Sequence, residues 1–338
     1  GILIPCRNKG RPIERWAFFL PMKQNENWSK FWAQGHVTTF GEFFKDGYRG
    51  EIGQWWDAVL QSFPEGGQVV DLGCGNTALL TAILDAGLQL QYIGVDPAAV
   101  SINPRASALL VESMFPPKLL AGYGAESVPL ESGSVDAVVS VFGIEYAELS
   151  EAIPEVSRLL VPEGRFDWVV HHADSIVSRM SERAIQEYNA PEIQAVILGL
   201  GTISAEATRV GLPGLKNSSA AEAARQEINT LATRYLNDTD LNTGNGTMFE
   251  FLTSALKFFR VLKSPEPDRV AFISNLAQEF EAYHARFSQM LSVVKSADDM
   301  EQLTQLCSQH QLSVLDLKTL NDEQGILGWI VSGKKVSV

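Results

Sequence analysis

The sequence predicts an α/β fold built on a doubly wound, mostly parallel sheet of seven strands, with a large helical insertion before the last two strands. Two observations support this prediction. Short apolar runs alternate with helical patterns from residue 67 to residue 173, as expected of a parallel sheet with helices on both faces. From residue 174 to residue 310 the strand pattern stops and apolar residues recur at helical spacing, before two further strand patterns in 311–338.

Composition limits the classes of partner. The chain has 338 residues, 45% of them hydrophobic, which exceeds the ~100–200 residues of a typical domain and supports a large core. Its net charge of −13 argues against sequence-independent binding to nucleic acid, which requires a positive surface. The three cysteines lie far apart, so they predict neither a disulfide framework nor a metal site and favour a cytoplasmic location. No uninterrupted run reaches ~18 apolar residues, so we expect no membrane partner.

The N-terminal segment has two parts. Residues 1–21 carry four basic residues and no periodicity, and Met22 opens a plausible natural start, so we expect an artificial leader before Met22. A genuine N-terminal extension is the alternative. Residues 22–66 are predicted to form a helical lead-in, which a Pro- and Gly-rich stretch ends before the first strand.

The core elements follow in chain order over residues 67–173. The stretch 68–72 is apolar and continuous, as expected of a strand buried on both faces. Four further strands are predicted at 90–95, 119–123, 135–141 and 165–170, with helices over 79–85, 98–115 and 153–160.

The insertion, residues 174–310, is predicted to be entirely helical. Two apolar seams, 248–262 and 270–294, repeat at spacings of three and four, and prolines separate them. We therefore expect an antiparallel helical hairpin. The insertion is expected to shape a substrate pocket or to form a homodimer contact. Residues 311–338 then supply the last two strands.

A glycine turn is the feature that carries chemistry. The first strand ends in Asp71-Leu72, the turn Gly73-Cys74-Gly75 follows, and the second strand ends on Asp96. This pattern is typical of a mononucleotide-binding half-sheet. A nicotinamide cofactor fits the loose Gly73-x-Gly75-x-x-Ala78 fingerprint, but Asp71 opposes it because dehydrogenases usually carry an apolar residue there.

Five segments in order resemble the class I S-adenosylmethionine-dependent methyltransferases, in particular the small-molecule type with a ubiquinone-biosynthesis-like core. They are Val69–Gly75, Ile93–Asp96, Gly124–Pro129, Gly133–Ser140 and Glu155–Phe166. The resemblance implies a Rossmann-like fold and transfer of a methyl group from S-adenosylmethionine to an oxygen or nitrogen of a small molecule, with S-adenosylhomocysteine as product. An NAD(P)-dependent oxidoreductase and a non-catalytic S-adenosylmethionine-binding protein are the alternatives.

Four residues of the pattern suit this methyl donor physically. Gly73 and Gly75 let the backbone approach the ligand without a Cβ clash. Asp71 can offer negative charge to the ammonium group of the donor, directly or through water. Asp96 can accept hydrogen bonds from both ribose hydroxyls, which is a charge-assisted pairing.

The resemblance adds further contacts with the donor. It implies that Pro97 lies against adenine, that the backbone amide of Ala125 contacts an adenine nitrogen, and that Ser140 and Val141 border the methionine end. Many relatives carry an aspartate that accepts from the adenine amino group. This chain has Gly124 at that position, so we expect Glu126 or a backbone carbonyl to replace it.

Catalysis by in-line displacement needs at most one general base, because alignment of the reacting groups does most of the work. Candidates follow the fourth and fifth strands, where the crevice of such a sheet opens. They are Glu145, Tyr146, His171 and His172. Adjacent histidines on a strand point to opposite faces, so at most one of them faces the site. In the lead-in, His36 and Tyr48 are expected to contact substrate.

Overall fold

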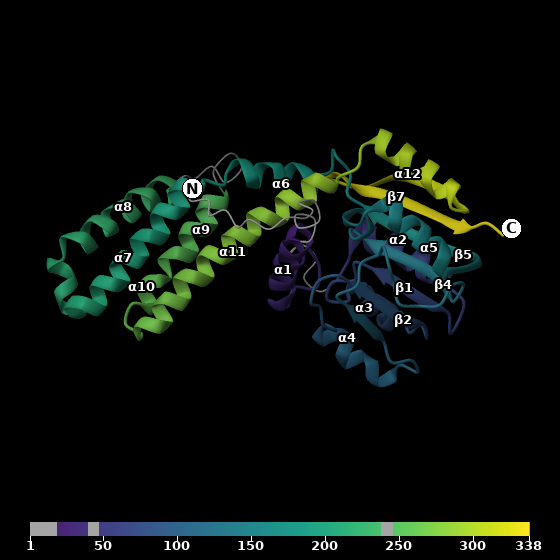
Figure 1. Cartoon of the computed structure of the whole chain (residues 1–338), viewed down its shortest axis with the longest axis horizontal. Helices are drawn as coiled ribbons and strands as arrows, with labels where there is room; N and C mark the ends of the chain where they lie inside the picture. Colours follow the sequence, from purple (N-terminus) through teal and green to yellow (C-terminus); the bar gives the residue numbers. More distant parts are fainter. Residues whose placement is uncertain (1–18, 40–46, 238–245, 338) are drawn as a thin grey trace, which may run out of the picture. The chain divides into compact units, whose positions relative to one another are not determined.

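The structure is a computed structural model that describes residues 19–39, 47–237 and 246–337 and divides into two compact units (Figure 1). The first unit extends to Val170 and also includes 297–323 and 328–338, whereas the second comprises 171–296 and 324–327. The sheet lies in the first unit, and the second is helical. Residues 1–18 lie outside the described residues, so the expected leader before Met22 stays a prediction.

The first unit is organised around a seven-stranded sheet in the order β3-β2-β1-β4-β5-β7-β6. The strands are β1 (Gln68–Leu72), β2 (Gln91–Asp96), β3 (Lys118–Ala121), β4 (Val135–Val141), β5 (Leu160–Val170), β6 (Leu312–Asp322) and β7 (Gly325–Lys335). Strands β1 to β5 pair in parallel, and β7 runs antiparallel to β5. The expected Rossmann-like fold class is confirmed.

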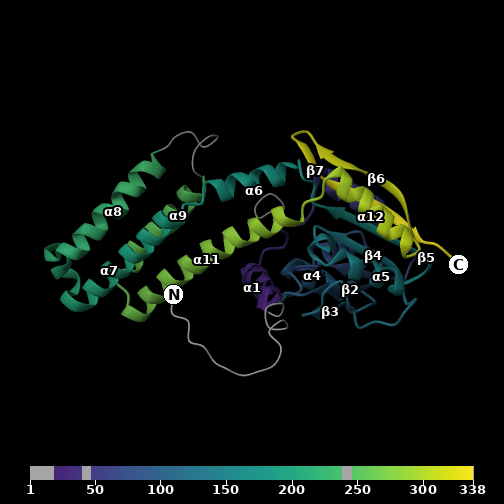
Figure 2. The same cartoon turned by 45° about the horizontal axis from the view of Figure 1, so that its top comes forward.

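Helices surround this sheet. They are α1 (Phe19–Ala33), α2 (Gly50–Leu60), α3 (Ala78–Asp85), α4 (Pro104–Leu109), α5 (Leu149–Leu159) and α12 (Ala297–Gln309), with short 3-10 turns η2 (Leu110–Glu112) and η3 (Ile144–Tyr146). Figure 2 shows α12 lying along β6, and the two elements are in contact. Ile153 of α5 and Met300 of α12 are buried with Phe166 and Trp168 of β5 in one apolar core, which is the hydrophobic contact that fixes these helices to the sheet.

The helix predicted over 98–115 is shorter in the structure. The side-chain oxygen of Asn103 accepts a hydrogen bond from the Ala106 amide at 2.9 Å and caps α4, whose first residue is Pro104. Proline is favoured in the first helical turn because its missing N–H would be unsatisfied there anyway. The helix therefore begins at Pro104, and the residues between β2 and the cap form a loop.

The strand register brings the expected site residues to one edge of the sheet. Leu72 of β1 pairs with Val95 of β2, and Asp71 pairs with Val139 of β4. Because the three strands are parallel, their carboxyl ends meet at the same edge. The glycine turn, Asp96 and the segment after Val141 all leave the sheet there.

The second unit contains α6 (Ile176–Gln186), α7 (Ala190–Gly214), η4 (Leu215–Asn217), α8 (Ser219–Leu236), α9 (Gly246–Leu256), α10 (Phe258–Val261) and α11 (Glu266–Val293). The expected hairpin corresponds to α9 and α10 against α11, which begins after Pro265, and Phe251 packs edge-on against Phe280 at 5.1 Å. The sequence prediction carries the insertion to residue 310, whereas α12 falls in the first unit.

The sequence predicts no membrane-spanning segment, but α7 and the turn after it meet the length and composition of one. Within the described residues, Ala190–Asn217 is long and apolar enough to cross a membrane by length and composition. The expectation rested on uninterrupted apolar runs. Polar residues such as Thr202 and Ser204 interrupt the apolar sequence of this helix, so it did not meet that criterion. Val196 and Leu200 of α7 are fully buried in the core of the second unit, whereas Leu198 is exposed. The absence of a membrane partner stays a prediction.

Candidate functional site

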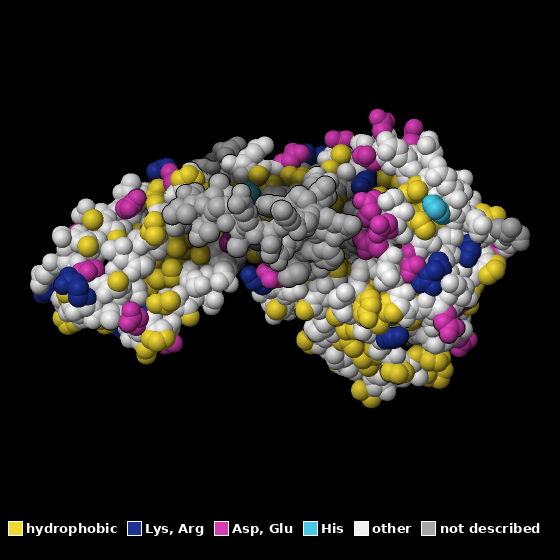
Figure 3. All heavy atoms as spheres, in the orientation of Figure 1, with side chains coloured by type: hydrophobic (Ala, Val, Ile, Leu, Met, Phe, Trp, Pro, Cys, Tyr) yellow, Lys and Arg dark blue, Asp and Glu magenta, His cyan; other side chains and the backbone are white. Residues whose placement is uncertain are grey.

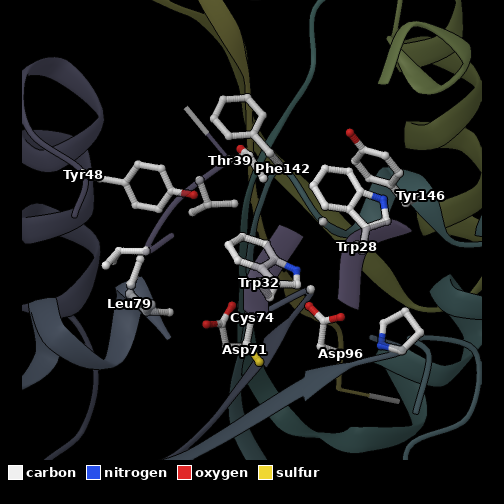
Figure 4. A pocket seen from close by; sticks show the side chains of 16 residues that line it. Trp28, Trp32, Thr39, Tyr48, Asp71, Cys74, Leu79, Asp96, Phe142 and Tyr146 are labelled. Atoms are coloured by element: carbon white, nitrogen blue, oxygen red, sulfur yellow. The ribbon is translucent and has the colours of Figure 1, made fainter. Parts of the chain in front are cut away.

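A pocket opens at the carboxyl ends of β1, β2 and β4 (Figure 4). The lead-in contributes Trp28, Trp32, Val37, Thr39 and Tyr48 to its lining. The glycine turn and the end of β2 contribute Asp71, Gly73, Cys74, Asp96 and Pro97, and the segment after β4 contributes Val141, Phe142, Gly143 and Tyr146. Among the described lining residues two are acidic and none is basic. The pocket is therefore suited to a neutral or cationic ligand with apolar parts.

The glycine turn forms one wall of this pocket, and its glycines are required sterically. Gly73 has a φ of 72°, and a Cβ there would lie 2.6 Å from the Cα of Gly143. Gly75 has a φ of 48°, and a Cβ there would lie 2.6 Å from the ring of Trp32. L-residues rarely adopt such backbone angles, and both neighbours occupy the space already. Both glycines are thus required for the packing of the turn, and the approach of their backbone to a ligand stays a prediction.

Asp96 is held by the backbone at the end of β2. Its carboxylate accepts the Gly75 amide at 2.9 Å on one oxygen and the Ala98 amide at 2.8 Å on the other. Burial raises its pKa to about 6, although both amides favour the charged form. Each carboxylate oxygen has a second lone pair. Asp96 can therefore accept two further hydrogen bonds from a ligand in the pocket.

Asp71 lies deeper, at the end of β1. It accepts a hydrogen bond from the hydroxyl of Tyr92 at 2.7 Å and is 4% exposed. Burial raises its pKa to about 7. Burial, followed by the charges of Asp71 and Glu145, also raises the pKa of Tyr48. This part of the pocket thus holds carboxyl groups that a bound cation would stabilise in their ionised form.

Ser140 and Val141, both expected near the donor, have different surroundings. Val141 lines the pocket. The Ser140 hydroxyl donates to the Leu72 carbonyl at 2.7 Å and accepts the Ile144 amide at 2.8 Å. Ser140 therefore joins the end of β1 to the turn after β4. It is not among the lining residues, and its hydrogen bonds hold segments that are.

Ala125 and Glu126, expected near adenine, do not line the described pocket. One carboxylate oxygen of Glu126 accepts the Glu148 amide at 3.0 Å, and the other fills the space that a Cβ on Gly124 would need. The carboxylate of Glu126 therefore lies over Gly124, where many relatives carry an acidic side chain.

The four catalytic candidates fall in two different units of the chain. Tyr146 lines the pocket, and its ring packs edge-on against Trp28 at 5.7 Å. Glu145 precedes it in η3 and is 3% exposed. Burial, and then the charge of Glu145, raises the pKa of Tyr146. His171 and His172 belong to the second unit, whereas every described lining residue belongs to the first.

Both histidines are buried. Burial lowers the pKa of His171 to about 3, which makes it a weak base at neutral pH. The Nδ1 atom of His172 accepts the Asp174 amide at 2.9 Å, and burial lowers its pKa as well. Their catalytic roles stay predictions.

The two substrate candidates of the lead-in also differ. Tyr48 lines the pocket, and Figure 4 shows its hydroxyl directed inward. His36 does not line it, because its ring stacks on Phe31 at 4.4 Å and its Nε2 lies 3.1 Å from Gln34. Sequence reasoning missed Trp32 and Phe142 as lining residues. The spacing of Trp28, Phe31 and Trp32 along one helix face was the available signal for the first.

A comparison with protein families assigns this region of the first unit. Residues 70–166 match the family model described as a methyltransferase domain. The match contains the glycine turn, Asp96 and the segments after β3 and β4. The chain therefore carries a methyltransferase domain of the class expected from the sequence.

Curated relatives agree with this assignment. Uncharacterized methyltransferases of Mycobacterium bovis and Mycobacterium tuberculosis are 35% identical over 108 residues, which is 32% of this chain and 41% of each relative. A malonyl-[acyl-carrier protein] O-methyltransferase of Alcanivorax borkumensis is 27% identical over 127 residues, which is 37% of this chain and 42% of that protein. The matches thus span less than half the length of these relatives.

Solved structures are similar only loosely. A S-adenosylmethionine-dependent methyltransferase of Methanosarcina mazei is 14% identical with a TM-score of 0.37, covering 83% of this chain and 98% of that one. A geranyl diphosphate methyltransferase in complex with GPP and sinefungin is 13% identical with a TM-score of 0.40, covering 84% of this chain and 77% of that one. At these values the solved structures add nothing to the assignment.

Proposed function

We propose that this protein is a S-adenosylmethionine-dependent methyltransferase that acts on an oxygen or nitrogen atom of a small-molecule acceptor. One observation carries the proposal. Two buried carboxyl groups, Asp71 and Asp96, face a single pocket beside a glycine turn, and no basic side chain is among its described lining residues. Such a site suits a ligand with positive charge and hydroxyl groups and no phosphate.

The residues present fit this donor. The backbone of Gly73 lines the pocket, and a side chain at Gly73 or Gly75 would collide with Gly143 or Trp32. Asp96 offers free lone pairs to ribose hydroxyls while two amides hold its carboxylate in place. Asp71 offers negative charge toward an ammonium group. When bound, S-adenosylmethionine supplies a methyl group activated by its sulfonium.

The remaining lining residues exclude water and orient an acceptor. Aromatic side chains from two segments, Trp28, Tyr48, Phe142 and Tyr146, surround the pocket. Tyr48 and Tyr146 present hydroxyl groups that can hold an acceptor by hydrogen bonds. Glu145 is the candidate general base of this unit, because it lies in η3 directly before Tyr146, which lines the pocket.

The surface supports a small-molecule acceptor. The net charge is −13, and Figure 3 shows acidic and basic side chains interspersed on the drawn face of the first unit. Sequence-independent binding to nucleic acid requires a more positive surface. The name of the Alcanivorax relative favours an oxygen acceptor over a nitrogen. A cytoplasmic location and a homodimer through the helical unit belong to the same proposal, and light scattering would detect the dimer.

Two measurements test the proposal. Calorimetry of the full chain with S-adenosylhomocysteine and with NADH should give binding of the first and no heat with the second. A screen of metabolite extracts with labelled methyl donor should then give a labelled small molecule that the Asp96→Ala variant does not produce. Binding of NADH alone would favour an oxidoreductase, and donor binding without any labelled product would favour a non-catalytic binding protein.

A further inference from the structure

The amide side chain of Asn76 connects three segments around the pocket. Asn76 follows the glycine turn and is 2% exposed. Its Nδ2 donates to the Trp32 carbonyl at 2.9 Å and to the His36 carbonyl at 2.8 Å, and its Oδ1 accepts the Ser101 amide at 3.0 Å. Both donors and the acceptor of this amide are therefore in use.

The two carbonyls that Asn76 binds lie in the last turn of α1 and in the segment just after it. The last carbonyls of a helix have no partner within it, so a side-chain donor there fixes where the helix ends. Trp32 lies in the last turn of α1, and His36 follows after the helix. Asn76 thus holds the exit of α1 against the glycine turn.

The ring of Trp32 completes this contact. A Cβ on Gly75 would lie 2.6 Å from the Trp32 ring, so the indole covers the glycine directly. Figure 4 shows the Trp32 ring between Asp71 and Asp96 at the centre of the pocket. Trp28, Val37 and Thr39 of the same segment also line the pocket. The pocket is therefore complete only when residues 28–39 are held in place.

We infer that Asn76 is a positioning residue that fastens the segment 28–39 over the methyl-donor pocket, so that donor binding and closure of this segment are coupled. The inference rests on the proposed function, since the donor is the ligand that the segment covers. A protein whose closed form is only partly populated binds its ligand more weakly in proportion to that population. Loss of the Asn76 contacts should therefore weaken donor binding while the sheet stays folded.

Two variants separate the hydrogen bonds from the packing. Asn76→Asp keeps the shape but directs an oxygen at the Trp32 and His36 carbonyls, which repel it, and Asn76→Ala removes the contacts without adding charge. We expect both to weaken the binding of S-adenosylhomocysteine by about tenfold, the effect of roughly one net hydrogen bond. Ser101→Ala is the control, because its backbone amide still donates to Asn76 and only a 3.5 Å hydroxyl contact is lost.

Hydrogen exchange provides a readout that a general loss of stability would not reproduce. In the wild type, S-adenosylhomocysteine should slow exchange of the Gln34 and Gly35 amides, which bond to Phe31 and Trp32. Both Asn76 variants should exchange faster there in the free chain, while peptides of α5 keep their wild-type rates.

The outcomes distinguish this inference from the proposed function. Failure of the wild type to bind S-adenosylhomocysteine would overturn the proposed function and the coupling with it. Wild-type binding, with unchanged affinity in both Asn76 variants or unchanged exchange in residues 31–39, would overturn the inference alone.

Discussion

The backbone amide of Gly75 donates to the carboxylate of Asp96 at 2.9 Å, and this hydrogen bond joins the turn after β1 to the end of β2. The two residues are 21 positions apart in the chain. The contact sets the distance between the turn and the carboxylate that we expect to hold ribose. One side chain, Asp96, therefore links the shape of the turn to the carboxylate that we propose as a ligand contact.

Replacement of Asp96 tests this linkage. Asp96→Ala should weaken the binding of S-adenosylhomocysteine by about 10–100-fold, because hydrogen bonds to a charged acceptor are lost. Isothermal titration calorimetry measures the change. The control is Asp85→Ala, which removes a carboxylate of α3 that pairs at the surface with Arg105. Equal affinity in the Asp96 variant and the wild type would exclude the assigned role.

Asp71 should oppose folding at neutral pH. Its pKa is raised from 3.8 to about 7 in the folded chain, chiefly by burial. A carboxyl with a raised pKa favours folding while protonated, so its contribution is present below pH 3.8 and is lost as the pH rises through about 7. Asp71→Asn should therefore raise the melting temperature by roughly 2–4 °C at pH 8 and by little at pH 4.

The same substitution should weaken binding of S-adenosylhomocysteine, since it removes the charge that faces the ammonium group. Thermal unfolding across the pH range, with the exposed Asp57→Asn as control, measures the first effect. A stability gain that does not depend on pH would contradict the assignment of the raised pKa to burial.

The two reasons for glycine at position 73 can be separated experimentally. Gly73 and Gly87 have φ values of 72° and 69°, but a Cβ would collide with Gly143 at the first and meet nothing within 4 Å at the second. Gly87→Ala should cost about 1 kcal/mol from backbone strain alone. Gly73→Ala should cost about 2–4 kcal/mol, because overpacking adds to that strain. Urea denaturation measures both, and equal costs would refute the collision.

His171 should stay neutral over most of the acidic range. Burial lowers its pKa from 6.5 to about 3. Its stabilising contribution is therefore present above pH 6.5 and is lost as the pH falls toward about 3. Nuclear magnetic resonance of the histidine ring protons should show one signal that does not titrate between pH 5 and 8, and His171→Gln identifies it. A titration near 6.5 would show instead that the ring is hydrated.

Several features were predictable because they depend on local sequence. Apolar continuity at 68–72 and 135–141 gave β1 and β4 with their observed bounds, since a strand buried on both faces needs such a run. The tight turn was predictable because its backbone angles favour glycine, and the position of Asp96 was predictable because it ends a short apolar strand. The prediction of a helix over 98–115 is wrong at its start, because the Asn103 cap and Pro104 fix the start of α4.

The sequence alone determined the order of strands and helices, the glycine turn and the identity of the two carboxyl groups, because each depends on neighbouring residues or on a short repeat. The tertiary structure decided which distant side chains share the pocket. Trp32 reaches Gly75, and Asn76 reaches the end of α1, through contacts between segments about 40 positions apart. No local pattern encodes these contacts, since they arise only when the lead-in packs against the edge of the folded sheet.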